Sequence, residues 1–152
     1  MNYRFVLDSY AWVEYAIGSQ MGKFVDFLLK YTACITPSIV IAELSDKFHR
    51  EDKVSDWQIL FKFIKHKSII NTLTENLEEK SGGCKLILRG MQKSEEKKIG
   101  LADAIIYQTA LDNDCELVTG DKHFEAINGI VYLKKKEMLV KIKEKILKNL
   151  KE

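Results

Sequence analysis

The segment Tyr3-Arg4-Phe5-Val6-Leu7-Asp8-Ser9 joins a short β-branched and aromatic run to an acidic residue. Such a run predicts a buried strand from Tyr3 to Leu7. A helix is predicted directly after it, from Ser9 to Ile17, and Gly18 ends that helix. Because a strand followed by a helix is the repeating unit of α/β proteins, Asp8 is expected at the carboxyl end of the first strand of a parallel sheet.

The same alternation continues along the chain. Further helices are predicted over Gln20–Tyr31, Ser38–Arg50, Asp56–Lys65 and Leu101–Asp112. Further strands are predicted over Ala33–Thr36, Ser68–Leu73, Glu116–Thr119 and Ile130–Leu133. The fold class is therefore α/β with a short, mainly parallel sheet.

Local signals between these elements give more detailed expectations. Ser38, which follows the only proline, is expected to cap its helix. Thr72-Leu73-Thr74-Glu75 has the form of a capping box, so a helix is expected to begin there. Gly82-Gly83 either breaks that helix or marks a turn, and Ser94–Gly100 is predicted to be a loop.

Composition limits the class of protein. The chain has 152 residues, of which 46% are hydrophobic and 30% charged, so it is expected to form one globular domain. No apolar run is long enough to span a membrane, and Asp8 interrupts the amino terminus before a secretory signal can develop. Three widely spaced cysteines are expected to be reduced thiols in a cytoplasmic protein.

The charge is distributed unevenly. Residues 134–152 hold eight lysines and three glutamates, a formal charge of +5, whereas residues 1–133 carry −3. Met138, Leu139, Ile142, Ile146, Leu147 and Leu150 fall on one stripe of a predicted helix in this basic segment. We expect residues 1–133 and this basic amphipathic helix, 134–152, to form parts of the same single domain.

Familiar catalytic motifs are absent from the sequence. It contains neither the GxxxxGK[ST] phosphate loop nor a GxSxG nucleophile motif. His49, His66 and His123 have no metal-ligand spacing and are interpreted as ordinary surface or packing residues.

Four carboxylates occupy positions that could converge. Asp8 and Asp121 each follow a predicted strand, whereas Glu43 and Asp103 lie near the beginnings of predicted helices. Ligands of parallel α/β proteins bind at the carboxyl edge of the sheet, where these elements meet. Each acid also has a structural explanation: Asp8 as a helix cap, Asp121 in a turn, Asp103 at a helix dipole and Glu43 as a solvated helix residue.

If the four acids do converge, they repel one another unless a cation is present. A set of oxygen ligands without His or Cys favours a hard ion such as Mg²⁺ or Mn²⁺. Such an ion can bind a phosphate oxygen and activate water, which points to hydrolysis of a phosphodiester.

Four ordered motifs resemble those of PIN-domain nucleases, and most closely those of VapC-type toxin ribonucleases. They are Val6-Leu7-Asp8-Ser9, Ser38-Ile39-Val40-Ile41-Ala42-Glu43-Leu44, Gly100-Leu101-Ala102-Asp103-Ala104-Ile105-Ile106 and Leu117-Val118-Thr119-Gly120-Asp121-Lys122-His123-Phe124. The resemblance implies a PIN-like three-layer α/β/α sandwich and a Mg²⁺- or Mn²⁺-dependent endoribonuclease. It also implies that Asp8, Glu43, Asp103 and Asp121 are the catalytic, metal-binding acids, flanked by the hydroxyls of Ser9 and Thr119.

The implied role is that of the toxin in a toxin–antitoxin pair, with RNA as substrate, an antitoxin protein as partner and a homodimer as the assembly. Alternatives are an RNA-processing or maturation nuclease and a non-catalytic nucleic-acid-binding PIN module. A phospho-acceptor receiver domain is disfavoured because Ser9, not a second acid, follows Asp8. Lys97, Lys98 and Lys122 are expected to bind RNA because they lie near Asp103 and Asp121 in sequence.

Overall fold

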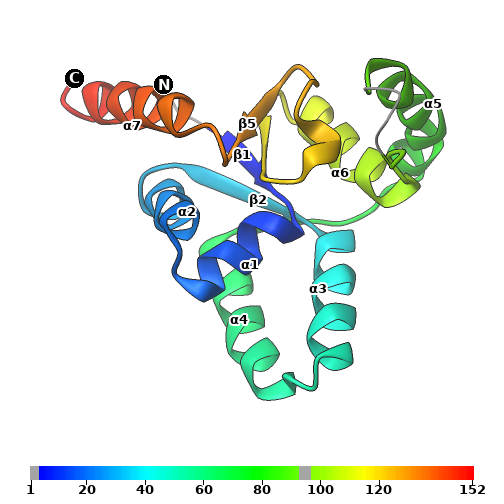
Figure 1. Cartoon of the computed structure of the whole chain (residues 1–152), viewed down its shortest axis with the longest axis horizontal. Coiled ribbons are helices and arrows are strands. Elements are labelled where there is room, and N and C mark those ends of the chain that lie inside the picture. The colour runs from blue at the N-terminus through cyan, green and yellow to red at the C-terminus, as the bar shows by residue number, and fades with distance from the viewer. Residues whose placement is uncertain (1–3, 93–96) are drawn as a thin grey trace.

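A five-stranded parallel sheet forms the centre of the computed structural model, which describes residues 4–92 and 97–152 (Figure 1). The strand order is β3-β2-β1-β4-β5. The strands are β1 (Arg4–Leu7), β2 (Ala33–Pro37), β3 (Ile69–Asn71), β4 (Glu116–Thr119) and β5 (Ile130–Tyr132). The helices are α1 (Ser9–Ile17), α2 (Gln20–Tyr31), α3 (Ser38–Arg50), α4 (Val54–Lys67), α5 (Glu75–Met91), α6 (Leu101–Asp112) and α7 (Lys136–Leu150), with a 3₁₀ turn η1 (Lys122–Phe124).

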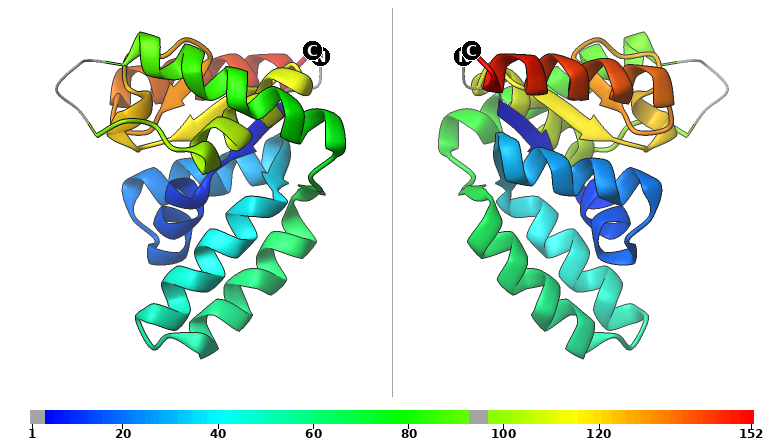
Figure 2. Two further views of the ribbon diagram at one scale, coloured as in Figure 1. Left: turned by 90° about the vertical axis from the view of Figure 1, so that its right-hand side faces the viewer. Right: turned by 90° about the vertical axis from the view of Figure 1, so that its left-hand side faces the viewer.

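Helices cover both faces of this sheet. Helices α5 and α6 lie in front of the strands in the left view of Figure 2, and α2 and α7 lie in front of them in the right view. Helices α3 and α4 form a hairpin that projects away from the sheet in both views. The predicted three-layer α/β/α architecture with a parallel sheet is therefore confirmed.

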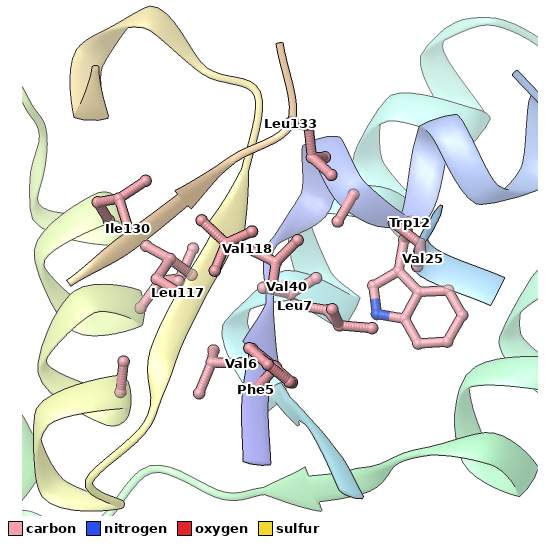
Figure 3. Packing of buried hydrophobic residues seen from close by; sticks show 14 of the residues in the cluster. Phe5, Val6, Leu7, Trp12, Val25, Val40, Leu117, Val118, Ile130 and Leu133 are labelled. Atoms are coloured by element: carbon pink, nitrogen blue, oxygen red, sulfur yellow. The ribbon is translucent and has the colours of Figure 1, made fainter. Parts of the chain in front are cut away.

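The core is built on β1, whose side chains alternate between the two faces of the sheet. Val6 points toward α6 together with Leu117, its register partner in β4 (Figure 3). Leu7 lies on the other side, where Trp12 of α1 is completely buried. Because β1 contributes buried side chains to both layers, it reads as a continuous apolar run rather than as an alternating one.

Register brings the strand ends to a common edge. Leu7 pairs with Val118, and the Asp8 N–H continues the ladder by donating to the Val118 carbonyl oxygen at 3.4 Å. On the other side of β1, Val6 pairs with Ile35 of β2. The carboxyl ends of β1, β2 and β4 therefore open on the same edge, from which α1 and α3 begin.

Two expectations about helix boundaries are wrong. Pro37, not Ser38, occupies the N-cap of α3, and no side chain caps that helix. Helix α5 runs without a break through Gly82-Gly83, because these glycines lie on its exposed face while Leu77, Cys84 and Leu88 are buried on the other face. Burial of one face therefore outweighs the low helix propensity of two glycines.

Smaller differences from the predicted boundaries concern the start of α5 and the length of β3. Helix α5 is capped by Thr74, which accepts from the Leu77 N–H at 3.2 Å, so its N-cap lies two residues after Thr72. Strand β3 is shorter than the predicted Ser68–Leu73. Tyr3 of the predicted first strand and residues 94–96 of the predicted loop lie outside the described residues.

The basic carboxy-terminal helix packs against the domain through only part of its apolar stripe. Leu139 and Ile146 are buried, and α7 contacts β5. Leu147 and Leu150, farther along the helix, remain exposed. The assignment of residues 1–133 and 134–152 to one domain stays a prediction. No helix in the described part of the chain is long and apolar enough to cross a membrane.

Gly22 allows α1 and α2 to pack closely, because a Cβ atom at this position would collide with the backbone of Glu14. We expect Gly22→Ala to lower the free energy of unfolding by about 1–3 kcal/mol, measured by urea denaturation. The matched control is Gly82→Ala, where no atom lies within 4 Å of the new Cβ. This control should raise stability by up to about 1 kcal/mol, and equal effects at the two positions would contradict the close packing.

Candidate active site

Asp8 is held at the junction of β1 and α1. It is the N-cap of α1, and its carboxylate accepts a hydrogen bond from the Ala11 N–H at 2.9 Å. Only 6% of its surface is exposed. The structural explanation of Asp8 as a cap is therefore correct, but burial of a carboxylate goes beyond what capping requires, because most capping acids remain solvated.

Thr119 and Asp121 come from the end of the neighbouring strand. The Asp121 N–H donates to the completely buried Thr119 hydroxyl at 3.0 Å, and the same hydroxyl interacts with Asp8. The Asp121 carboxylate accepts from the His123 N–H at 3.0 Å, which begins the 3₁₀ turn η1. Asp121 thus forms the predicted turn. This turn places the His123 ring beside the carboxylates of Asp103 and Asp121.

Glu43 reaches this edge from α3. The Ser9 hydroxyl, one residue after Asp8, donates to Glu43 Oε1 at 2.7 Å. Glu43 is partly buried, so the explanation of a solvated helix residue is wrong. The contact joins the first residue of α1 to the second turn of α3.

Asp103 lies in the first turn of α6, on the opposite layer. Its Oδ2 atom is 3.3 Å from His123 Nδ1, and Asp121 Oδ1 is 3.4 Å from the same nitrogen. One ligand atom from each of these three residues lies within 4.8 Å of the others, close enough to hold one metal ion. The interpretation of His123 as an ordinary residue missed this position; its place two residues after Asp121, in the same motif, was the available signal.

The electrostatic effects link all four predicted acids. Burial is the main cause that raises the pKa of Asp8 to about 7; the Thr119 and Ala11 hydrogen bonds oppose it, and the Asp121 and Glu43 charges add to it. Burial, together with the charges of Asp103 and Asp121, raises the pKa of Glu43 despite the Ser9 hydrogen bond. Burial and Asp121 also raise the pKa of Asp103, while His123 lowers it. The structure therefore brings the four acids together.

The three lysines expected to bind RNA are all exposed, and no described contact joins their ammonium groups to these acids. Lys97 and Lys98 precede α6 in a segment held by Gln92, which donates to the Lys97 carbonyl at 3.1 Å and accepts from the Ile99 N–H at 2.7 Å. Lys122 lies in η1. Their role in RNA binding stays a prediction.

The arrangement fits a divalent cation. Its donor set consists of carboxylate oxygens with one imidazole nitrogen, and the acids are partly desolvated and mutually repulsive. Oxygen donors match Mg²⁺ and Mn²⁺, and an added imidazole is more acceptable to Mn²⁺ than to Mg²⁺. A cation at this position would reverse the electrostatic cost of holding these acids ionised.

The raised pKa of Asp8 predicts that the free energy of unfolding depends on pH. Folded Asp8 retains its proton up to about pH 7, whereas an unperturbed aspartate has a pKa of 3.8, so the folded state binds more protons between these values. The free energy of unfolding should therefore fall as pH rises from 4 to 7 in metal-free buffer. Asp8→Asn retains a capping oxygen and cannot ionise, so its stability should fall less and exceed that of the wild type at pH 8. Parallel curves for the two proteins, from urea denaturation, would contradict burial as the dominant effect.

Solved structures with the same fold include several toxin–antitoxin proteins. VapBC2 of Rickettsia felis, solved with a fragment of its promoter DNA, aligns with a TM-score of 0.65 and 19% identity over 85% of this chain and 96% of that chain. A toxin–antitoxin complex from Klebsiella pneumoniae aligns with a TM-score of 0.64 and 19% identity, covering 84% and 96%. VapC20 of Mycobacterium tuberculosis, a toxin that cleaves the sarcin–ricin loop, aligns with a TM-score of 0.61 and 15% identity, covering 82% and 95%.

No curated protein sequence matches this chain. The family model of the PIN domain matches residues 5–130, a region that contains all four acids, both hydroxyl residues and His123. With this match over most of its length, and with the parallel sheet that the solved neighbours share, the chain belongs to the PIN domain family.

Proposed function

We propose that this protein is a Mg²⁺- or Mn²⁺-dependent endoribonuclease that hydrolyses RNA phosphodiester bonds as the toxin of a toxin–antitoxin pair. The observation that carries the nuclease proposal is the convergence of Asp8, Glu43, Asp103 and Asp121 at one sheet edge of a PIN domain. Partial desolvation of four acids with only His123 as a basic partner is costly, and a purely structural set of acids has no reason to bear this cost. The RNA-processing alternative shares this chemistry and differs in its partner.

The residues of the site have distinct proposed roles. Asp8, Glu43, Asp103 and Asp121 would hold the metal and make up the catalytic set. When bound, the cation would supply positive charge to a phosphate oxygen and lower the pKa of a coordinated water. Ser9 orients Glu43 through its hydrogen bond, and Thr119 holds the Asp121 backbone while contacting Asp8. His123 restrains both Asp103 and Asp121.

The matched pair Glu43→Gln and Glu79→Gln tests the site. Both substitutions remove one carboxylate from a helix, but Glu79 is exposed in α5. We expect Glu43→Gln to lower Mn²⁺-dependent cleavage of single-stranded RNA by at least about tenfold and Glu79→Gln to leave it unchanged, as followed by gel electrophoresis. Asp8→Asn, Asp103→Asn and Asp121→Asn should likewise fold and lose cleavage.

Thermal melts provide a readout that does not depend on cleavage. Binding of Mn²⁺ to the folded protein should stabilise it by about 2.7 kcal/mol at a hundredfold excess over Kd, and Asp103→Asn should reduce this gain. Wild-type cleavage by all four neutralised variants would reject these acids as the site. Metal-dependent stabilisation without RNA cleavage would favour the non-catalytic PIN module.

The toxin proposal is supported by the solved neighbours that are toxin–antitoxin complexes. A suitable docking surface is the groove of about 750 Å³ that α1, α2, α3 and α4 form. Three apolar side chains that line it are exposed by 69%, 56% and 42%: Ile17, Ile59 and Phe63. Exposed apolar side chains in a concave surface are typical of protein-binding sites, and we propose that an antitoxin segment covers them.

Co-expression with the product of the adjacent reading frame tests this partner. We expect that protein to co-purify with the chain and to inhibit its RNA cleavage. Ile59→Lys should weaken the complex at least about tenfold by titration calorimetry, whereas Leu86→Lys should not, although Leu86 on α5 is the more exposed of the two (74% against 56%). An active nuclease without such a partner would favour the RNA-processing alternative.

We further propose a homodimer in the cytoplasm. Val140, Leu147 and Leu150 lie at helical spacing on α7 and are 53%, 42% and 56% exposed, which supports self-association through this helix. The three cysteines are free thiols, as a reducing compartment requires.

A further inference from the structure

Four lysines line one groove at the beginning of α7. The groove has a volume of about 850 Å³, and its charged lining residues are Lys134, Lys135, Lys136, Lys141, Glu116 and Glu137. All four lysines are exposed. Four ammonium groups and two carboxylates leave the groove with a net positive charge, in contrast to the acidic edge of the sheet.

These four lysines are not neutralised by the protein. Within residues 4–92 and 97–152 none of them forms an ion pair, whereas Lys30, Lys47 and Lys80 each pair with a carboxylate. Three of the four, Lys134 to Lys136, are consecutive and end at the first residue of α7, where the helix dipole disfavours cations by about 0.3–1 kcal/mol each. An unpaired cationic cluster in an unfavourable position has a physical reason if an anion occupies the groove.

Lys134 connects this groove to the acidic site. Its Nζ atom lies 5.6 Å from the centre of the Tyr10 ring. That ring packs on Gly120, where a Cβ atom would collide with it, directly before Asp121. Burial and then the charges of Glu14, Asp8 and Asp121 raise the pKa of Tyr10, so the phenol lies within electrostatic range of two of the site acids. Acidic site, Tyr10, Lys134 and groove are thus neighbours in this order.

We infer that the groove binds the phosphates of single-stranded RNA on one side of the bond to be cleaved, with Lys134 as the first contact beyond the acids. The inference rests on the proposed ribonuclease function and adds the path of the substrate. Acids that hold a metal repel the other phosphates of the strand, so nearby cations must supply the affinity. The partly buried Tyr10 ring lies between the two regions, so the strand would pass beside it on its way from the acids to the groove.

The test compares two double variants of the same helix. Lys136→Gln/Lys141→Gln removes two charges from the groove, and Lys148→Gln/Lys151→Gln removes two exposed charges from the other end of α7. Binding of a fluorescein-labelled single-stranded RNA of mixed sequence is measured by anisotropy against salt concentration, in EDTA so that no metal-dependent cleavage occurs. Thermal melts verify that both variants fold.

We expect the groove variant to bind more weakly and its salt slope to flatten by about 1.4, at roughly 0.7 for each lost phosphate contact on a single strand. The control variant should retain the wild-type slope. Equal slopes for the two variants, or no binding of this RNA by the wild type, would overturn the inference. A retained RNA slope with weakened binding of polyglutamate would assign the groove to an acidic protein and also overturn it.

The groove and the nuclease function can each fail independently in these experiments. Loss of RNA affinity in the groove variant, with no cleavage by the wild type, would support the groove and reject the nuclease. Cleavage that depends on Glu43, with unchanged slopes in the groove variant, would support the nuclease and reject the groove. Lys134→Gln adds a third readout, because it should raise the KM for RNA more than it lowers kcat.

Discussion

The parallel pairing of β1 with β4 is the constraint on which the site depends. Leu7 lies beside Val118, and the ladder continues for one more residue because the Asp8 N–H donates to the Val118 carbonyl. This bond holds Asp8 against Thr119, whose hydroxyl in turn holds the Asp121 backbone. A shift of β4 by one residue in this register would turn Val118 to the other layer and move Asp121 away from Asp8. The apolar core that fixes the register therefore also fixes the geometry of the charged residues.

Holding several acids together at the carboxyl edge of the sheet costs electrostatic free energy. Burial raises the pKa of Asp8, Glu43 and Asp103, and each of the three is also affected by the charge of another acid in the group. The side-chain contacts that offset this cost come from Thr119, Ser9 and His123, all of which orient a carboxylate rather than neutralise it fully. A structure that only needed stable turns at these positions would leave the acids in solvent. Unfavourable electrostatics of this kind are concentrated at functional sites, where the stability of the surrounding core compensates for them.

Much of the fold could be predicted from local patterns: apolar periodicity marks α2 and α3, and Gly18, Pro37 and Gly100 mark the end of α1 and the starts of α3 and α6. Helix α5 could not, because only tertiary burial of Leu77 and Leu88 explains why Gly82 and Gly83 remain helical. The acids were predictable as strand ends and helix starts. For His123, its place two residues after Asp121 was the available signal, but its contact with Asp103 depends on a turn that Asp121 itself creates. The order of the strands likewise depends on long-range packing rather than on local sequence.

Surfaces of opposite charge lie close together, and the proposed ribonuclease function gives this arrangement a reason. A metal-binding cluster of acids cannot attract a polyanion along its length, because only the phosphate at the metal gains from it while the neighbouring phosphates are repelled. The affinity for a nucleic acid must then come from cations that are near the acids but not paired with them. Here the Tyr10 ring lies between Lys134, whose Nζ atom is 5.6 Å from the ring centre, and Gly120, which directly precedes Asp121. The sequence is negative over residues 1–133 and positive over residues 134–152. Four lysines of the positive segment line the groove at the beginning of α7. The lysine groove of α7 and the acidic edge of the sheet meet at Tyr10, which contacts Lys134 on one side and lies near Asp8 and Asp121 on the other.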